Sequence, residues 1–171
     1  EAQSFLIRCG SVPGEEDFFQ SLAKYLAAAL EMDFVCIDVL LADGLTAQTL
    51  AVYCDGEFID NAAYALKDTP CGEAAGQTIC CFPRDVQRLF PKDEVLRDIK
   101  ADSYVGTTLW SSEGKPIGLI AVIGRRPLAD STFAQSLLKL VAVRASGELE
   151  RRQAEAALRT NEAKLSSLLN A

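Results

Sequence analysis

The segment from Asp130 to Ala171 contains no proline and only one glycine, Gly147. Its composition otherwise favours an uninterrupted α-helix. Roughly 40 helical residues would span about 60 Å, because an α-helix rises about 1.5 Å per residue. A compact domain formed by the rest of the chain has a diameter of under about 40 Å. We therefore expect a long C-terminal helix that projects beyond the domain.

The projecting half of this helix carries an apolar seam. Ala154, Leu158, Leu165 and Leu168 recur at alternating four- and three-residue spacing, with Asn161 at the remaining core position. An apolar stripe in the first half can pack on the domain and on another helix, and the register between the two changes near residues 149–154. We predict a parallel homodimer with the following interface residues: Leu138, Ala145, Leu149, Leu158, Leu165 and Leu168.

The first half of the chain reads as a helix followed by a hairpin. Apolar residues at three- and four-residue spacing predict an amphipathic helix over residues 15–31. Two apolar runs, 33–41 and 45–54, flank an Asp-Gly step that predicts a β-hairpin turn. The next stretch, EFIDNAAYAL, predicts a short edge strand or an extended segment.

The second half is a cross-connection followed by another hairpin. The pattern predicts a short helix near residues 71–75, a strand in QTICCF, and one or two short helices broken at Pro91. Two β runs, 103–110 and 116–124, then form a second hairpin. The run PIGLIAVIG is apolar on both faces and therefore belongs in the middle of a covered sheet. This order predicts an α+β domain.

The composition excludes several kinds of site. The chain has no histidine, which excludes histidine-ligated haem, histidine-containing zinc sites, and catalysis by a Ser-His-Asp or Cys-His set. Its formal net charge of −7 disfavours binding to the phosphate backbone of nucleic acids. No apolar run is long enough to span a membrane, so we expect no membrane contact and a cytoplasmic location. The only methionine is Met32, so we expect the chain to be part of a longer protein.

Six cysteines are present, and no CxxC pair supports a zinc ribbon. Two of them, Cys36 and Cys54, lie in apolar runs, where a reduced cysteine behaves as a small core residue. The one clustering is the trio Cys71, Cys80 and Cys81. We expect buried thiols in a reducing compartment.

Four stretches together resemble a GAF domain: FFQSLAKYLAAALEMDFVCIDVLL, TPCGEAAGQTICCFPRDVQRLFP, SYVGTTLWSSEGKPIGLIAVI and the exit helix. The resemblance is to the GAF domains of multi-domain sensor histidine kinases and diguanylate cyclases. Residues 148–171 look like the signalling helix that leads from such a domain into a PAS domain. This organisation implies an N-terminal linker (1–14), a GAF domain (15–147) and a coiled-coil linker (148–171).

The resemblance implies an antiparallel sheet of five or six strands. Helices cover one face, loops and short helices cap the other, and a small-molecule pocket lies under the caps. Bilin- and haem-binding members rely on histidine, the motif of the cyclic-nucleotide binders cannot be found in order, and no convincing iron ligand set can be assembled. The ligand therefore stays unknown. From the expected topology we nominate the following candidate pocket residues: Asn61, Tyr64, Thr69, Cys71, Cys80, Tyr104 and Thr108.

Each nominated residue has a structural alternative, such as a core tyrosine, a strand threonine or a turn asparagine. Asp38 also stands out, because a carboxylate in an apolar strand must be paired or neutralised if it is buried. It could face either the pocket or solvent.

Three functions remain open. The main interpretation is a non-catalytic sensory module that binds a small molecule and signals through a dimeric helix to a downstream PAS, kinase or cyclase domain. A structural relay without ligand is the second. The third is a GAF-fold free methionine-R-sulfoxide reductase or a thiol redox sensor using Cys71, Cys80 or Cys81. That reductase family has a further cysteine in a loop where this chain reads LRDIKADSYVG.

Overall fold

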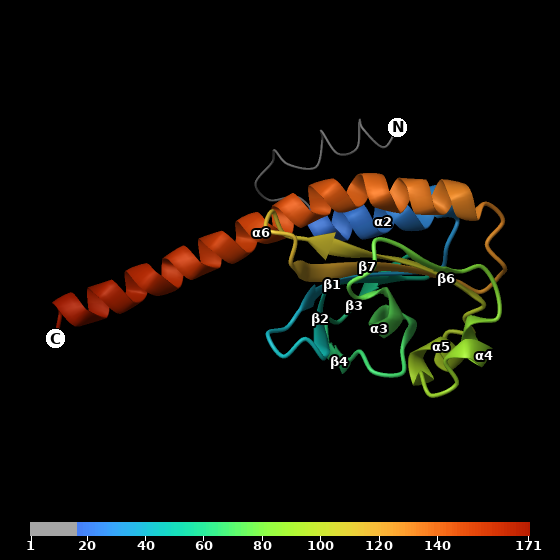
Figure 1. Ribbon diagram of the computed structural model, residues 1–171, viewed down its shortest axis with the longest axis horizontal. Helices are drawn as coiled ribbons and strands as arrows, with labels where there is room; N and C mark the ends of the chain where they lie inside the picture. The colour runs from blue at the N-terminus through green and yellow to red at the C-terminus, as the bar shows by residue number, and fades with distance from the viewer. Residues whose placement is uncertain (1–16) are drawn as a thin grey trace.

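The computed structural model describes residues 17–171, so the expected linker 1–14 and Cys9 lie outside the described residues. The described elements follow the predicted order (Figure 1). The helices are α2 (Phe18–Leu30), α3 (Pro70–Ala74), α4 (Val86–Leu89), α5 (Glu94–Asp98) and α6 (Ser131–Leu169). The strands are β1 (Phe34–Leu40), β2 (Thr46–Cys54), β3 (Glu57–Ile59), β4 (Ala63–Ala65), β5 (Cys80–Phe82), β6 (Ser103–Trp110) and β7 (Pro116–Gly124).

The strands form one antiparallel sheet in the order β3-β2-β1-β7-β6-β5, and β4 also pairs with β2. The sheet has seven strands where five or six were expected. The additional strand arises because the stretch expected as a single edge strand is broken at residues 60–62. Its first part, β3, pairs with the end of β2, and its second part, β4, pairs with the beginning of β2.

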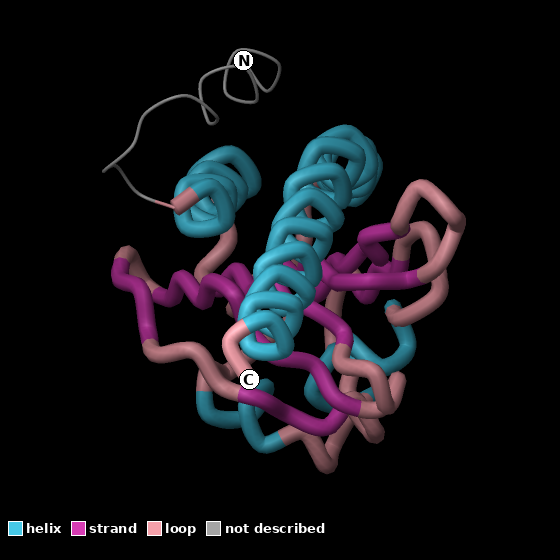
Figure 2. Tube along the Cα trace, turned by 90° about the vertical axis from the view of Figure 1, so that its left-hand side faces the viewer, coloured by secondary structure: helices cyan, strands magenta, loops and turns pink. Residues whose placement is uncertain are grey.

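Two helices cover one face of the sheet, and the short helices lie on the other (Figures 1 and 2). Asp17 caps α2 by accepting a hydrogen bond from the Phe19 N–H, as part of a capping box with Gln20. Between the helices and the sheet lies a continuous apolar core, which includes Phe19, Leu22, Leu26, Ile37, Ile120, Val122, Leu138 and Val141. The predicted α+β class is confirmed.

β7 contributes side chains to the apolar cores on both faces of the sheet. Ile120 and Val122 belong to the core under the helices, whereas Ala121 and Ile123 belong to the second core, on the capped face. This alternation explains why the run PIGLIAVIG is apolar on both faces. At Gly118 an added Cβ would lie 2.8 Å from Cδ2 of Leu149, so the glycine lets α6 approach the sheet closely.

The predicted long helix is confirmed as α6, which has 39 residues. Its side chains are buried on the sheet as far as Leu149, and beyond Arg152 the helix projects away from the domain (Figure 1). Within residues 17–171, no helix is both long and apolar enough to cross a membrane.

Candidate functional site

A pocket of about 620 Å³ lies on the capped face of the sheet, opposite α2 and α6. Its floor is formed by side chains of β1, β2 and β7, among them Phe34, Val52 and Ala121. The β3–β4 segment forms one wall, and α3 and α5 supply the others. Its volume is within the usual range for small-molecule sites.

Local sequence signals position the walls. Thr69 is the N-cap of α3, where its hydroxyl accepts a hydrogen bond from the Gly72 N–H. Asp93 caps α5 in the same way, by accepting from the N–H groups of Val95 and Leu96.

Arg125 secures the far end of α5 to the sheet. Its Nε donates to the Ile99 carbonyl over 2.7 Å, while its guanidinium pairs with Asp55 and lies 3.7 Å from Asp33. The wall formed by α5 is therefore attached to the turn between β2 and β3 and to the start of β1.

A buried carboxyl group lies beside the pocket. Asp38, on β1, is fully buried and accepts hydrogen bonds from the Cys36 thiol and the Tyr64 hydroxyl. Burial raises the pKa of Asp38 to about 6, and the two hydrogen bonds counteract part of that increase. Tyr64 thereby connects the pocket wall at β4 to the central strand of the sheet.

Burial disfavours the thiolate form of the four cysteines on β1, α3 and β5. Burial, together with the nearby Asp38, raises the pKa of Cys71 to about 12, and the hydrogen bond that the Tyr104 hydroxyl donates to its sulfur opposes part of the increase. Burial also raises the pKa of Cys36, Cys80 and Cys81. Thiolate chemistry needs the opposite shift.

Three of the nominated residues line the pocket, and the structure places the other four elsewhere. Tyr64, Thr69 and Cys71 line it. Asn61 instead ties the connection between β3 and β4 to β2, by accepting from the Thr49 hydroxyl and donating to the Leu50 carbonyl.

The remaining nominated residues support the caps from β5 and β6. The Thr108 hydroxyl donates to the Ala74 carbonyl and accepts from the Gly76 N–H, so it holds the end of α3. Tyr104 is fully buried, and its hydroxyl donates to the sulfur of Cys71 over 3.4 Å. Cys80 is half-buried on β5 and lies outside the pocket lining.

The sequence reasoning missed the contribution of the segment 92–99, which forms a wall of the pocket. The available signal was the apolar spacing of Val95, Leu96 and Ile99 directly after Pro91. Within residues 17–171, no group of cysteine and acidic side chains is arranged to hold a metal ion.

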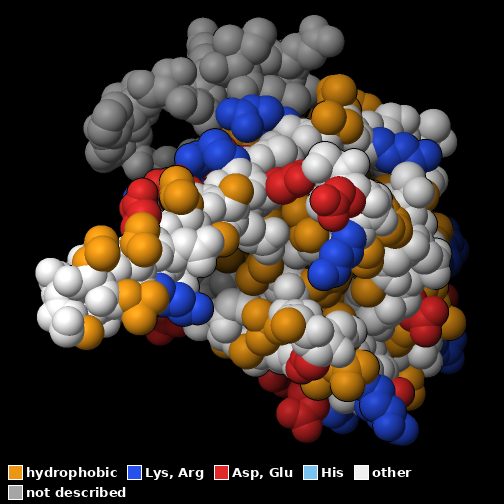
Figure 3. All heavy atoms as spheres, turned by 60° about the vertical axis from the view of Figure 1, so that its left-hand side comes forward, with side chains coloured by type: hydrophobic (Ala, Val, Ile, Leu, Met, Phe, Trp, Pro, Cys, Tyr) orange, Lys and Arg blue, Asp and Glu red, His pale blue; other side chains and the backbone are white. Residues whose placement is uncertain are grey.

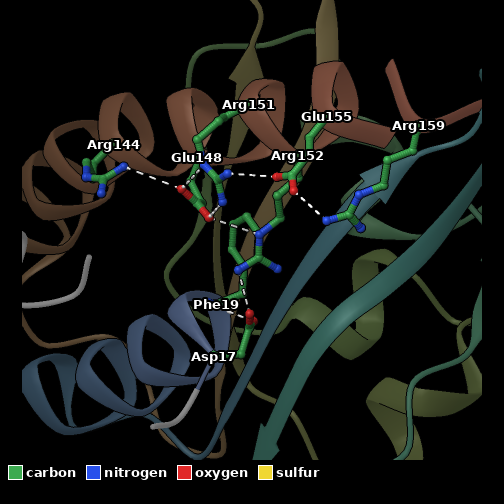
Figure 4. Close-up of polar contacts among 8 residues, drawn as sticks. All are labelled: Asp17, Phe19, Arg144, Glu148, Arg151, Arg152, Glu155 and Arg159. Carbon is green, nitrogen blue, oxygen red and sulfur yellow. Dashed lines mark hydrogen bonds and ion pairs between the residues drawn. The ribbon is translucent and has the colours of Figure 1, made fainter. Parts of the chain in front are cut away.

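A second cluster of interest lies where α6 leaves the domain (Figure 4). Glu148 is buried and pairs with Arg151 at 2.9 Å and with Arg152 at 3.0 Å. Arg152 also pairs with Asp17 at the start of α2, and its guanidinium lies 4.6 Å from the centroid of the Phe19 ring. This cluster, which we call the exit cluster, ties the end of the buried part of α6 to α2.

The six residues predicted at a dimer interface fall into two groups. Leu138, Ala145 and Leu149 are buried within their own domain, where they pack against the sheet and α2, so they are unavailable to a second copy. Leu158, Leu165 and Leu168 lie on the projecting part, with exposed fractions of 58%, 60% and 75%. Figure 3 shows hydrophobic side chains gathered on this projection. The dimer prediction is accordingly restricted to the second group.

Comparisons with known proteins agree with this architecture. A model of the GAF domain family matches residues 15–149. The solved GAF domain of a phosphoenolpyruvate-protein phosphotransferase from Acinetobacter has a TM-score of 0.72 at 17% identity, over 91% of this chain and 94% of that chain. Among curated proteins, no sequence matches the chain.

Two chromophore-binding domains are also similar. That of an unusual bacteriophytochrome from R. palustris has a TM-score of 0.67 at 13% identity, over 89% of this chain and 60% of that chain. That of Stigmatella aurantiaca phytochrome P1 has a TM-score of 0.66 at 13% identity, over 85% of this chain and 57% of that chain. At these identities the similarity shows the fold alone.

Proposed function

Because the chain belongs to the GAF domain family, we propose that it is a sensory module whose pocket binds a small molecule and whose α6 carries the response to an output domain. The observation that carries the proposal is the shared sheet. One face of the sheet is the floor of the pocket, and its other face is the surface on which α6 packs.

β7 connects the two faces directly. Ala121 and Ile123 line the pocket, while Ile120 and Val122 pack in the core under α2 and α6. Because protein interiors are close-packed, a ligand that displaces the pocket side of this strand also disturbs its helix side.

β6 and the hairpin after it provide a second connection. Thr108 holds the end of α3, and two residues later the Trp110 N–H donates to the Ser146 hydroxyl on α6. At the tip of the hairpin, Ser112 donates to Glu150 from both its backbone and its hydroxyl. A displacement of α3 over the pocket would therefore be transmitted through β6 and its hairpin to the part of α6 that leaves the domain.

The projecting part of α6 is the proposed output. We propose that residues 148–171 form a parallel coiled coil with a second copy and lead into a PAS domain, in a sensor histidine kinase or, less favoured, a diguanylate cyclase. The exposed leucines and the absence of any covering element among the described residues support this assignment. Five free cysteines in residues 17–171 support a reducing compartment, the cytoplasm.

The thiol alternatives receive no support from the geometry. A reductase needs a nucleophilic thiolate, whereas the pKa of Cys71 is raised to about 12. Cys80 and Cys81 are neighbours on β5 and point to opposite faces of the sheet. The ligand-free relay differs from the sensor only in whether the pocket is used.

Filling the pocket from its floor tests the sensory function. Ala121→Leu adds apolar bulk where β7 faces the pocket, and we expect altered amide hydrogen exchange in α6 around residues 142–155. Ala42→Leu adds the same bulk on the exposed turn between β1 and β2 and should leave α6 exchange unchanged. Exchange would be followed by mass spectrometry, with stability measured in parallel. If α6 exchange is unchanged in Ala121→Leu while peptides around the pocket respond, the proposed coupling is wrong.

A further inference from the structure

The polar side chains that line the pocket interior are already engaged with the protein. The Thr49 hydroxyl donates to Asn61 over 3.0 Å and accepts from the Ala62 N–H over 2.8 Å. The Thr69 hydroxyl donates to the Leu66 carbonyl while it accepts from the N–H at the start of α3. Both threonines thus complete the loops that carry them and offer a ligand little hydrogen-bonding capacity.

The same holds for the groups around the buried carboxyl. The Tyr64 hydroxyl and the Cys36 thiol both direct their protons to Asp38. The sulfur of Cys71 accepts from Tyr104, which leaves its weakly donating S–H as the remaining polar group. A ligand with several polar groups would lose hydrogen bonds to water on entering this interior and would not regain them.

The rest of the interior is apolar. Aromatic and aliphatic side chains cover the floor and the α5 wall: Phe34, Val52, Ala121, Ile123, Leu96 and Ile99. This surface favours a hydrophobic ligand body, because burying apolar area is the main gain available there.

The mouth of the pocket has the opposite character. Six charged residues are part of the pocket lining: Asp60, Asp93, Glu94, Asp98, Lys67 and Lys92. All of them except Asp93 are exposed to solvent, which assigns them to the open side of the pocket. Asp93 is used as the cap of α5, and Lys92 lies 3.7 Å from Asp68.

The other acidic groups at the mouth are free to act on a ligand. Asp60, Glu94 and Asp98 are exposed, and within the described part of the chain their carboxylates make no ion pair. Against these three stands one lysine, Lys67, that is likewise unpaired among the described residues. The mouth therefore favours a positive charge and disfavours a negative one.

We propose that the pocket binds a hydrophobic monocation, with an apolar body against the sheet and an ammonium-type group at the acidic mouth. This inference rests on the proposed function, since it names the ligand class of the same pocket. It disfavours ligands whose charge is carried by carboxylates or phosphates.

Three probes with one ring system test the charge preference. These are 2-naphthylmethylammonium, 2-naphthylmethanol and 2-naphthoate, with dissociation constants measured by calorimetry at low salt. We expect the ammonium probe to bind about tenfold more tightly than naphthoate, with the alcohol between them. The ratio should shrink in high salt, because exposed charges are screened. Equal affinities, the reverse order, or no binding of any probe would overturn the proposal.

Two variants locate the preference at the mouth. Asp60→Lys combined with Asp98→Lys should remove or reverse the order of the charged probes. Glu113→Lys combined with Glu162→Lys makes the same change in net charge away from the pocket and should keep the order. Ala121→Leu should weaken all three probes. An order that survives the Asp60 and Asp98 substitutions would contradict the proposed mouth.

The two proposals fail separately. If no probe binds but Ala121→Leu still alters α6 exchange, the ligand class is wrong and the sensory function stands. If the ammonium probe binds in the expected order but neither it nor Ala121→Leu alters α6 exchange, the ligand class stands and the sensory function fails.

Discussion

At the scale of single residues, the buried carboxyl of Asp38 is the feature with the clearest physical consequence. It lies on a central strand with no positive charge hydrogen-bonded to it, and its two partners are the thiol of Cys36 and the hydroxyl of Tyr64. Burial disfavours the ionised form, so the carboxyl stays protonated to a higher pH in the folded protein than in the unfolded chain. Folding is therefore opposed by this group at neutral pH and not in acid.

Asp38→Asn should accordingly stabilise the protein at pH 7.5. The pKa of Asp38 rises from 3.8 to about 6, so its contribution to the free energy of unfolding falls by about 3 kcal/mol as the pH rises through that window. We expect the variant to gain up to about 3 kcal/mol at pH 7.5 and little at pH 4, measured by urea unfolding. A wild-type minus variant difference that does not depend on pH would contradict this assignment.

Asp43→Asn is the matched control. Asp43 is exposed at the β1–β2 turn, where hydrogen bonds from the Leu45 N–H and from Thr46 lower its pKa. Its contribution to stability is present above its unfolded pKa and is lost as the pH falls through the lower folded value. The two variants should therefore show pH dependences of opposite sign.

The sequence could single out Asp38 but could not decide which way it faces. A carboxylate inside VCIDVLL requires an explanation, yet the partner that decides its environment, Tyr64, is 26 positions away. The same limit affected Asn61 and Thr108, which are polar residues near the pocket whose side chains donate to backbone carbonyls of β2 and α3. Local patterns predict where a side chain lies along a strand, whereas tertiary contacts decide what it binds.

At the scale of elements, the helices and long strands were predictable because their apolar periodicity is strong. The short elements were harder to predict. The edge strand, which is divided into β3 and β4 in the structure, shows the reason. Three-residue strands carry too little pattern, and their pairing with β2 depends on the sheet that receives them. A similar limit applies to Leu138, Ala145 and Leu149 of the predicted dimer interface, which are buried within their own domain. Periodicity marks a buried face of α6 but does not say whether the sheet or a second helix covers it.

The exit cluster should control how firmly α6 is held where it leaves the domain. Glu148→Gln removes the one carboxylate that joins Arg144, Arg151 and Arg152. We expect a loss of about 1–2 kcal/mol in the free energy of unfolding and faster amide exchange around residues 148–155, because Glu148 is largely buried. Hydrogen exchange and urea unfolding measure the two effects.

Glu155→Gln provides the comparison on the same helix. Glu155 pairs with Arg151 and Arg159 but is far more exposed than Glu148, and exposed pairs contribute about 0.5 kcal/mol or less. Equal effects of the two glutamine substitutions would show that the exit cluster is no more than an ordinary set of surface ion pairs.

At the scale of the whole molecule, the pocket and the output helix lie on opposite faces of one sheet. The helix then continues beyond the domain with exposed leucines at coiled-coil spacing. Fully burying a leucine side chain stabilises a complex by roughly 1.5–3 kcal/mol, so pairing along this seam would stabilise a dimer of two copies. The account depends on that pairing, because a lone projecting helix would have no partner against which to transmit a change of register.

Sedimentation velocity on the chain and on a version that ends at Leu149 tests this claim most directly. We predict a dimer for the 171-residue chain at tens of micromolar and a weaker dimer or a monomer for the shortened one. Leu158→Gln with Leu165→Gln should weaken the dimer, whereas Ala156→Gln with Ala163→Gln, off the seam of the same helix, should not. A monomer for both chain lengths at that concentration would contradict signalling through a dimeric α6.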